Sequence, residues 1–161
     1  MVLGVLALAL ALAGCRASGM VFVKSSTFRI VEPNPFGTVT LPLTVKWTEG
    51  APFRPGDRFA LFLDRGSIGI GENILHLVPD SCRKVPTCSP SQYLQQRNVY
   101  VTNTTSMSLA TLPSTSLTGH STGKEDHTVV IVVLDSSGTR VGEQYASVDF
   151  VYQRHGLPSM T

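Results

Sequence analysis

Residues 128–152 read TVVIVVLDSSGTRVGEQYASVDFVY, and this stretch decides the fold. It opens with a continuous β-branched run, Val129–Leu134, and then reaches the cluster Asp135–Gly138, where glycine takes a positive φ at little cost. The chain then returns with apolar side chains at every second position, at Ala146, Val148, Phe150 and Tyr152. A β-branched run, a turn and an alternating run predict a β-hairpin.

Two segments upstream carry further strand patterns. From Val39 to Trp47 apolar and polar residues alternate strictly, which predicts one strand with one buried face. Pro42 lies within this segment and cannot donate to a ladder, so we expect an edge strand or a bulge there. Phe59–Leu63 is apolar at every position, which is typical of a central strand covered on both faces.

Weaker strand patterns and one helix signal complete the chain. The weaker strands are expected at 27–31, 75–78, 99–102 and 107–112. Ser89, Pro90 and Gln92 form a capping box with proline at the first helical position. This signal predicts one short helix over about residues 90–97.

About seven short strands with almost no helical periodicity predict an all-β domain built as a two-sheet sandwich. Trp47, on its alternating strand, resembles the buried tryptophan of immunoglobulin-like and fibronectin type III domains, and the hairpin resembles their last two strands. The resemblance spans residues 27–152 and implies a single antiparallel β-sandwich. The chain departs from this type in the long segment 65–98, which carries two cysteines and the expected short helix.

The cysteines are Cys15, Cys82 and Cys88. Cys82 and Cys88 lie six positions apart in the segment 65–98, so they do not bridge two sheets. Their spacing forms neither a C-x-x-C redox motif nor a four-ligand zinc site. In an oxidising compartment we expect a Cys82–Cys88 disulfide that pins this long loop, with two free thiols as the alternative.

The chain begins MVLGVLALALALAGC, in which the apolar run Val2–Ala13 ends in Leu12-Ala13-Gly14-Cys15. A run of this length is too short to span a bilayer and has the form of a secretory signal. Its end resembles the lipobox of bacterial lipoproteins, which implies a lipid on the sulfur of Cys15. Cleavage after Ala13, which releases a secreted protein, and a buried apolar element are the alternatives.

The odd cysteine count favours the lipidated form, because a lipid on Cys15 leaves Cys82 and Cys88 to pair. The expected organisation is a signal peptide at 1–14, a lipidated N-terminus and tether at 15–26, the sandwich domain at 27–152 and a tail at 153–161. The protein is then expected in the cell envelope, lipid-anchored to the outer face of a bacterial membrane, with secretion as the alternative.

The charge composition of the chain argues against one class of binding partner. The net charge is +2, charged residues make up 15% of the chain, and the basic residues are scattered except for Arg83-Lys84. A nucleic-acid partner needs a clustered basic face, so no such partner is expected. No motif indicates a cofactor, and none is expected.

Few residues of the sequence lie in a pattern that indicates metal binding or catalysis. His120, Asp126 and His127 lie on and beside one polar loop, and they are the candidate metal ligands because imidazole and carboxylate groups suit divalent metals. Serines are abundant, but no predicted strand-turn-helix surrounds the G-x-S-x-G letters of residues 119–123, which a nucleophile elbow needs. We therefore expect no catalytic activity, and a hydrolase whose site is assembled from loops is the alternative.

Long ordered loops on a rigid sandwich commonly carry binding, so the segment 65–98 is the expected contact surface. Its candidate contact residues are Arg83, Lys84, Tyr93 and Arg97. The sequence thus predicts a non-catalytic, membrane-tethered sandwich that binds a protein or a cell-envelope component. The alternatives are an envelope protein that binds a small ligand or a metal, and a secreted hydrolase.

Overall fold

The computed structural model describes residues 23–50, 54–114 and 123–154. Strands dominate this part of the chain, and three short helical elements interrupt them. In order the elements are β1 (Val23–Lys24), β2 (Ile30–Glu32), β3 (Thr38–Val39), β4 (Leu43–Trp47), β5 (Arg58–Leu63), the 3-10 helix η1 (Ile74–Leu77), α1 (Asp80–Arg83), α2 (Pro90–Gln96), β6 (Val99–Thr102), β7 (Ser106–Leu109), β8 (Lys124–Leu134) and β9 (Arg140–Gln153). The expected all-β class is confirmed.

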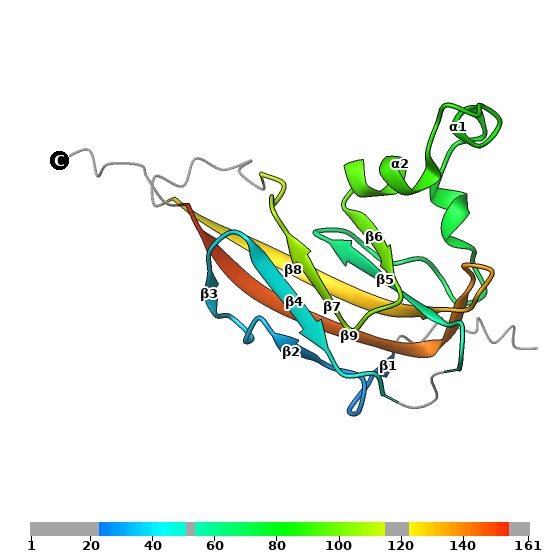
Figure 1. Cartoon of the computed structure of the whole chain (residues 1–161). Coiled ribbons are helices and arrows are strands. Elements are labelled where there is room, and N and C mark those ends of the chain that lie inside the picture. Colours follow the sequence, from blue (N-terminus) through cyan, green and yellow to red (C-terminus); the bar gives the residue numbers. More distant parts are fainter. Residues whose placement is uncertain (1–22, 51–53, 115–122, 155–161) are drawn as a thin grey trace, which may run out of the picture.

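The strands form two sheets (Figure 1). The larger sheet has the order β1-β9-β8-β5-β6, with β3 also paired to β9, and the smaller sheet has the order β2-β4-β7. Pairing between these strands is antiparallel except where β1 and β3 run parallel to β9. The expected antiparallel pairing is therefore wrong at this edge, because the chain before β4 twice runs beside β9 in the same direction.

The expected C-terminal hairpin is confirmed as β8 and β9, which pair over most of their length. The carboxylate of Asp135 fixes the turn, because its Oδ1 accepts hydrogen bonds from the N–H groups of Ser137 and Thr139 at 2.8 and 2.9 Å. Gly138 follows with a φ of 88°, and a Cβ there would lie 3.2 Å from Ile74 Cγ2. The turn therefore needs glycine both for its conformation and for space.

The two sheets enclose the first hydrophobic core. Burial alternates along β4 as expected, with Leu43, Val45 and Trp47 buried between the sheets. Trp47 packs edge-on against Phe59 of β5, with ring centroids 5.2 Å apart. The larger sheet contributes Phe59, Leu61, Leu63, Val129, Ile131, Ala146, Val148 and Phe150.

A second hydrophobic core lies on the opposite face of the larger sheet. β5 serves both cores, because Phe59 and Leu61 belong to the first while Ala60 and Phe62 belong to the second. The segment 65–98, which we call the cover, packs on this face as a third layer (Figure 1). Its members of the second core are Ile68, Ile74, Val78, Cys82 and Leu94. Two covered faces explain why β5 is apolar at every position after Arg58.

The single strand expected at 39–47 is wrong, because the segment forms two strands. β3 ends at Val39 in the larger sheet, and β4 begins at Leu43 in the smaller sheet. Pro42 lies in the crossover, where its missing N–H costs no ladder hydrogen bond. The apolar alternation runs through the crossover because Val39 and Leu41 also pack against the first core.

The helical elements of the cover were only partly expected. The short helix is confirmed as α2, where Ser89 Oγ accepts a hydrogen bond from the Gln92 N–H at 3.4 Å. The strand expected at 75–78 is wrong, because most of it lies in η1. Asn73 Oδ1 accepts from the Leu75 N–H at 2.9 Å, and this cap starts a helical turn in place of a strand.

Other boundaries differ by a few residues. The strand expected at 99–102 is confirmed as β6, while those expected at 27–31 and 107–112 form the shorter β2 and β7. β1 pairs with β9, and Ser25 is buried. The larger sheet therefore includes residues before residue 27.

Candidate functional site

Arg140 of β9 attaches the first part of the cover to the larger sheet. Its side chain is 1% exposed, and its guanidinium donates to Ser67 Oγ, to the Ile68 carbonyl and to the Glu143 carbonyl at 3.2, 2.6 and 3.3 Å. Burial lowers the pKa of Arg140 below its ordinary value, yet a guanidinium stays charged at neutral pH. A buried cation thus joins the β8–β9 hairpin to the cover.

The β8–β9 turn holds the next part of the cover. Asn73 Nδ2 donates to the Ser137 carbonyl at 2.9 Å, and the Ile74 N–H donates to the Gly138 carbonyl at 2.8 Å. The Arg140 N–H donates to the Glu72 carbonyl at 2.9 Å. These bonds place the cover on a rigid hairpin, which is how scaffolds position binding loops.

The Cys82–Cys88 disulfide is present and closes the middle of the cover. Cys82 is 6% exposed and belongs to the second core, so the bridge is tied to the buried side of the cover. The residues between the two cysteines are exposed. We call residues 82–88 the tip, which begins with the last two residues of α1 (Figure 1).

Arg83 and Lys84, two of the expected contact residues, lie on the tip and are exposed. Asp80 pairs with both of them: Arg83 Nη2 contacts Oδ1, and Lys84 Nζ lies 3.3 Å from Oδ2. The hydrogen bond from Arg83, and then that from Lys84, holds the pKa of Asp80 below its ordinary value. Exposed pairs of this kind are weak and screened by salt, so either cation can exchange Asp80 for a ligand.

Tyr93 and Arg97 come together one helical turn apart on α2 and its C-terminal cap. The guanidinium carbon of Arg97 lies 4.9 Å from the centre of the Tyr93 ring, in a cation–π contact. Arg65 Nη1 donates to the Arg97 carbonyl at 3.0 Å and so joins the two ends of the cover. All four expected contact residues therefore lie on the cover, in two pairs on different elements.

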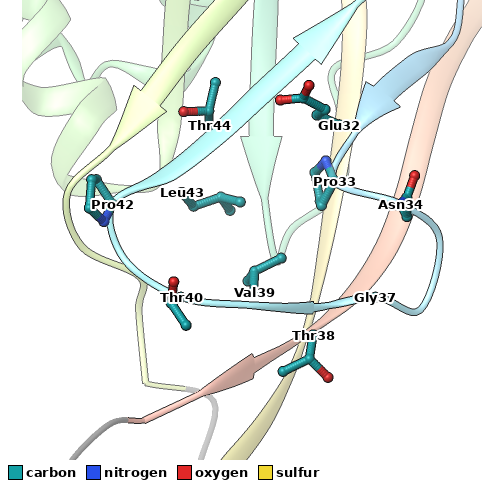
Figure 2. A pocket seen from close by; sticks show the side chains of 10 residues that line it. All are labelled: Glu32, Pro33, Asn34, Gly37, Thr38, Val39, Thr40, Pro42, Leu43 and Thr44. Carbon is teal, nitrogen blue, oxygen red and sulfur yellow. The ribbon is translucent and has the colours of Figure 1, made fainter.

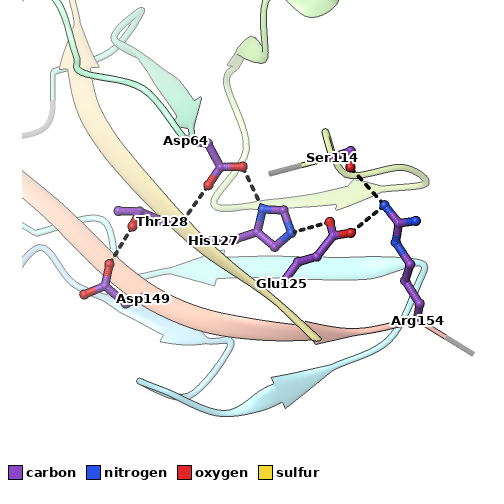
Figure 3. Close-up of polar contacts among 7 residues, drawn as sticks. All are labelled: Asp64, Ser114, Glu125, His127, Thr128, Asp149 and Arg154. Atoms are coloured by element: carbon purple, nitrogen blue, oxygen red, sulfur yellow. Dashed lines mark hydrogen bonds and ion pairs between the residues drawn. The ribbon is translucent and has the colours of Figure 1, made fainter. Parts of the chain in front are cut away.

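His127 lies in a buried polar cluster near the start of β8 (Figure 3). Its side chain has 0% exposure, its Nδ1 lies 2.7 Å from Asp64 Oδ2, and its Nε2 lies 3.7 Å from Glu125 Oε2. Arg154 pairs with Glu125 and donates to Ser114 Oγ at 3.0 Å. The ring of His127 also stacks on Phe150 of the neighbouring strand, at 5.5 Å between centroids.

Polar contacts lock this cluster in place. His127 Nδ1 is within hydrogen-bond distance of Asp64 Oδ2, whereas the buried Nε2 has no hydrogen-bond partner among the described residues and lies 3.7 Å from Glu125 Oε2. The cluster holds Asp64, Glu125 and Arg154 together. Because the His127 side chain has no exposed surface, it offers no open catalytic base.

The candidate metal ligands do not converge. Asp126 is exposed while His127 is buried, because neighbours on a strand point to opposite faces. His120 lies outside the described residues. Within residues 23–50, 54–114 and 123–154, no three His, Cys, Asp or Glu side chains are grouped so that they could hold a metal ion. Asp126 and His127 therefore do not face one common site, and a role for His120 stays a prediction.

An open pocket lies where the chain crosses from β2 through β3 to β4 (Figure 2). Val39 and Leu43 lie at its centre, with Pro33 and Pro42 on opposite sides. Its polar lining residues are Glu32, Asn34, Thr38, Thr40 and Thr44. Lys46 pairs with Glu32 at this rim at 3.0 Å, and both side chains are exposed.

Sequence patterns did not mark Arg140, Asp64 or Glu125. Asp64 directly follows β5 and Arg140 is the first residue of β9, and a charged residue at either place is ordinarily taken as a strand boundary. Their partners lie far away in the chain, such as His127 for Asp64 and Ile68 for Arg140. Glu125 lies two residues before His127 and keeps the alternation of the buried face of β8, and this is a signal that the sequence offered.

Comparison with known proteins returned no matching family model, no matching curated protein and no matching solved structure. In the part of the chain that the structure describes, no helix is long and apolar enough to cross a membrane. Cys15, the expected lipid site, lies outside that part.

Proposed function

We propose that the chain is an exported, membrane-tethered, non-catalytic domain that binds a protein or a cell-envelope component through its cover. The apolar run Val2–Ala13 and the lipobox-like end at Cys15 support export and lipidation. The Cys82–Cys88 disulfide agrees with an oxidising compartment. Its two sulfurs pair with each other, so a lipid on Cys15 leaves no odd thiol.

The proposed domain type is an immunoglobulin-like or fibronectin type III-like sandwich. Support comes from the two sheets packed around Trp47 and from the C-terminal hairpin in the larger sheet. The β2-β4-β7 order of the smaller sheet also suits this type. The cover, which makes a third layer, is the departure from it.

The observation that carries the binding proposal is the ordered cover. Its inward side chains fill the second core, and the buried Arg140 and the disulfide hold it in place. Its outward side chains include Arg83, Lys84 and Arg97, which are exposed. A surface that is already ordered binds at lower entropic cost than a flexible loop.

The non-catalytic part of the proposal is supported by the surroundings of His127. A general base must come within hydrogen-bond distance of the proton that it removes. His127 has no exposed surface, and its ring nitrogens face Asp64 and Glu125.

The cover is tested by substitutions that leave its core intact. The cover variant is Arg83→Gln/Lys84→Gln/Arg97→Gln, and the control variant, with the same change of charge at exposed sites elsewhere, is Arg29→Gln/Arg54→Gln/Lys124→Gln. Sedimentation of the labelled protein with envelope isolated from its own host measures binding. We expect about tenfold weaker binding for the cover variant alone, as for loss of an interface hot spot. Equal binding by the two variants contradicts the proposal.

The anchor is tested separately by the intact mass of the protein purified from its native membrane. A diacylglyceryl mass on a chain that begins at Cys15 is expected, and Cys15→Ser should leave the full-length precursor. A mature chain that begins at Gly14 with an unmodified Cys15 contradicts the lipid anchor and favours secretion.

The pocket between β2, β3 and β4 supports a second candidate function, the binding of a small polar ligand. An apolar centre with a few polar groups at the rim is typical of small-molecule sites. Soluble envelope fragments titrated into the isotope-labelled protein should then shift the amide resonances of Gly37, Thr38 and Thr40. Absence of such shifts removes this candidate.

A further inference from the structure

We propose that the tip (residues 82–88) rests on an anionic lipid headgroup surface when the chain is tethered to a membrane. This inference builds on the proposed lipid at Cys15, and it names the envelope component that the cover contacts.

The excess positive charge of the chain lies in the cover. The whole chain has 13 Lys and Arg residues against 11 Asp and Glu residues. The cover holds four of the cations and two of the anions, namely Arg65, Arg83, Lys84 and Arg97 against Glu72 and Asp80. The remaining nine cations are matched by nine anions. The net charge of +2 is therefore concentrated on one layer, which is attracted to an anionic surface.

The tip combines basic and apolar side chains. The side chain of Lys84 is 77% exposed, Val85 is 46% exposed, and Pro86 is exposed as well. The disulfide holds one end of this ring in the second core, so these residues are fixed on the outer side. Segments that lie at a membrane interface have this mixture of basic and apolar groups.

Along the β8–β9 hairpin, the cover and β1 both lie toward the end that carries the turn, with α1 on the far side of the sheet from β1 (Figure 1). β1 pairs with β9 at Gln144 and Tyr145, and Tyr145 packs against the second core beneath the cover. Residues 16–22 separate Cys15 from β1, and a chain of this length spans at most about 28 Å. A lipid on Cys15 therefore keeps this end close to the headgroups.

The tether is essential to the contact. Two cations and a few apolar side chains gain little at a headgroup surface, and Asp80 offsets one of the charges. A short tether raises the effective concentration of the tip at the surface to the order of millimolar. We therefore expect the tip to orient a tethered domain and not to recruit a free one.

The test attaches the lipid chemically, so that it does not depend on lipidation in cells. The chain from Cys15 onward is coupled through that thiol to a maleimide lipid, since Cys82 and Cys88 are already paired. The vesicles contain phosphatidylglycerol with phosphatidylcholine, or phosphatidylcholine alone. Acetylation of Lys84 by a water-soluble reagent, relative to the exposed Lys124, is measured by mass spectrometry. We expect Lys84 to react about threefold more slowly on the anionic vesicles.

Two matched variants complete the experiment. Arg83→Gln/Val85→Ser should remove the protection of Lys84, while Arg29→Gln/Val31→Ser, which changes an exposed cation and an exposed valine near the smaller sheet, should retain it. Equal reaction of Lys84 on the two vesicles overturns the proposal, and so does protection that survives in the first variant or is lost in both. The intact mass of the native protein tests the lipid at Cys15 separately. Failure of the proposed anchor and failure of the proposed membrane contact of the tip are therefore distinguishable.

Discussion

At the scale of single residues, Arg140 joins the hairpin to the cover. Arg140→Met removes the donor to the buried Ile68 carbonyl and the bonds to Ser67 and Glu143. We expect the free energy of unfolding to fall by about 2–4 kcal/mol in urea titrations followed by circular dichroism. Arg140→Lys should recover little, because an ammonium group does not reproduce the planar fork. A loss below about 1 kcal/mol contradicts the role assigned to Arg140.

Asp64 has a comparable role in the polar cluster. Asp64→Ala removes the acceptor of both His127 Nδ1 and the Thr128 N–H. We expect a loss of about 2–3 kcal/mol in the free energy of unfolding, because two buried donors lose a charged partner. Asp149→Ala is the control, because it removes one exposed hydrogen bond to Thr128 Oγ1 and should cost less than about 1 kcal/mol. Equal losses for the two variants would show that the cluster is not a lock.

Residues whose structural role depends only on nearby positions in the sequence were predictable. The Cys82–Cys88 pair, the Ser89 cap and the buried Trp47 each follow from spacing or alternation within a few positions. Arg140 and Asp64 were not, because their importance depends on partners more than 60 positions away. A tertiary contact of that kind leaves no periodicity in the chain.

At the scale of elements, the disulfide stabilises the cover by closing a short ring. Cys82→Ser/Cys88→Ser should lower the free energy of unfolding by about 2 kcal/mol, since a ring of this size removes only a little entropy from the unfolded chain. The protein should still fold, because Ile68, Ile74 and Leu94 retain the second core. Chemical denaturation with and without a reductant measures the loss, and an unchanged midpoint contradicts it.

The β8–β9 turn makes the stability of the fold depend on pH in the acidic range. The side-chain hydrogen bond from Ser137, and then the Thr139 N–H, lowers the pKa of Asp135 in the folded state. A lowered folded pKa adds stability that is complete above the unfolded pKa and is lost as the pH falls through the folded pKa. Between about pH 6 and about pH 3 the wild type should therefore lose more stability than Asp135→Asn. Parallel losses in urea titrations at the two pH values contradict this prediction.

Elements that show one sequence pattern and lie in one sheet or layer were predicted. The segment that crosses from one sheet to the other was not. The hairpin, β5 and α2 follow from alternation, continuous apolarity and a capping box. The segment 39–47 alternates without a break, yet it divides between two sheets, because both halves pack on the same core. Residues 74–77 form a helical turn because Asn73 caps it and because Ile74 packs in the second core.

At the scale of the whole molecule, the cover and the two sheets should unfold together, because β5 belongs to both cores. Leu94→Ala, in the second core, should lower the free energy of unfolding by about 2–4 kcal/mol. Trp47, the single tryptophan, lies in the first core, and its fluorescence should report the same shift as circular dichroism. Val85→Ala at the exposed tip is the control and should leave both midpoints unchanged. A Trp47 transition that does not move with Leu94→Ala would mean that the layers unfold separately.

The place of the candidate site was predictable, but its relation to the fold was not. The length of the segment 65–98 and its cysteines marked it as unusual for a sandwich. Its burial against the outer face of the larger sheet depends on tertiary packing, which no local pattern reveals. Consequently, excision of residues 82–96 is an unsuitable test of binding, since it would remove Cys82 and Leu94 from the second core.

The central claim is that the tethered protein contacts its partner, or the membrane surface, through the cover. The most direct measurement is photocrosslinking in living cells, with a photoreactive lysine analogue placed at position 84 of the tip or at position 124 of β8. Both positions are exposed, so they sample solvent alike. The account predicts a specific lipid or protein adduct from position 84 that position 124 does not form. Identical adducts from the two positions, or adducts from position 124 alone, would contradict it.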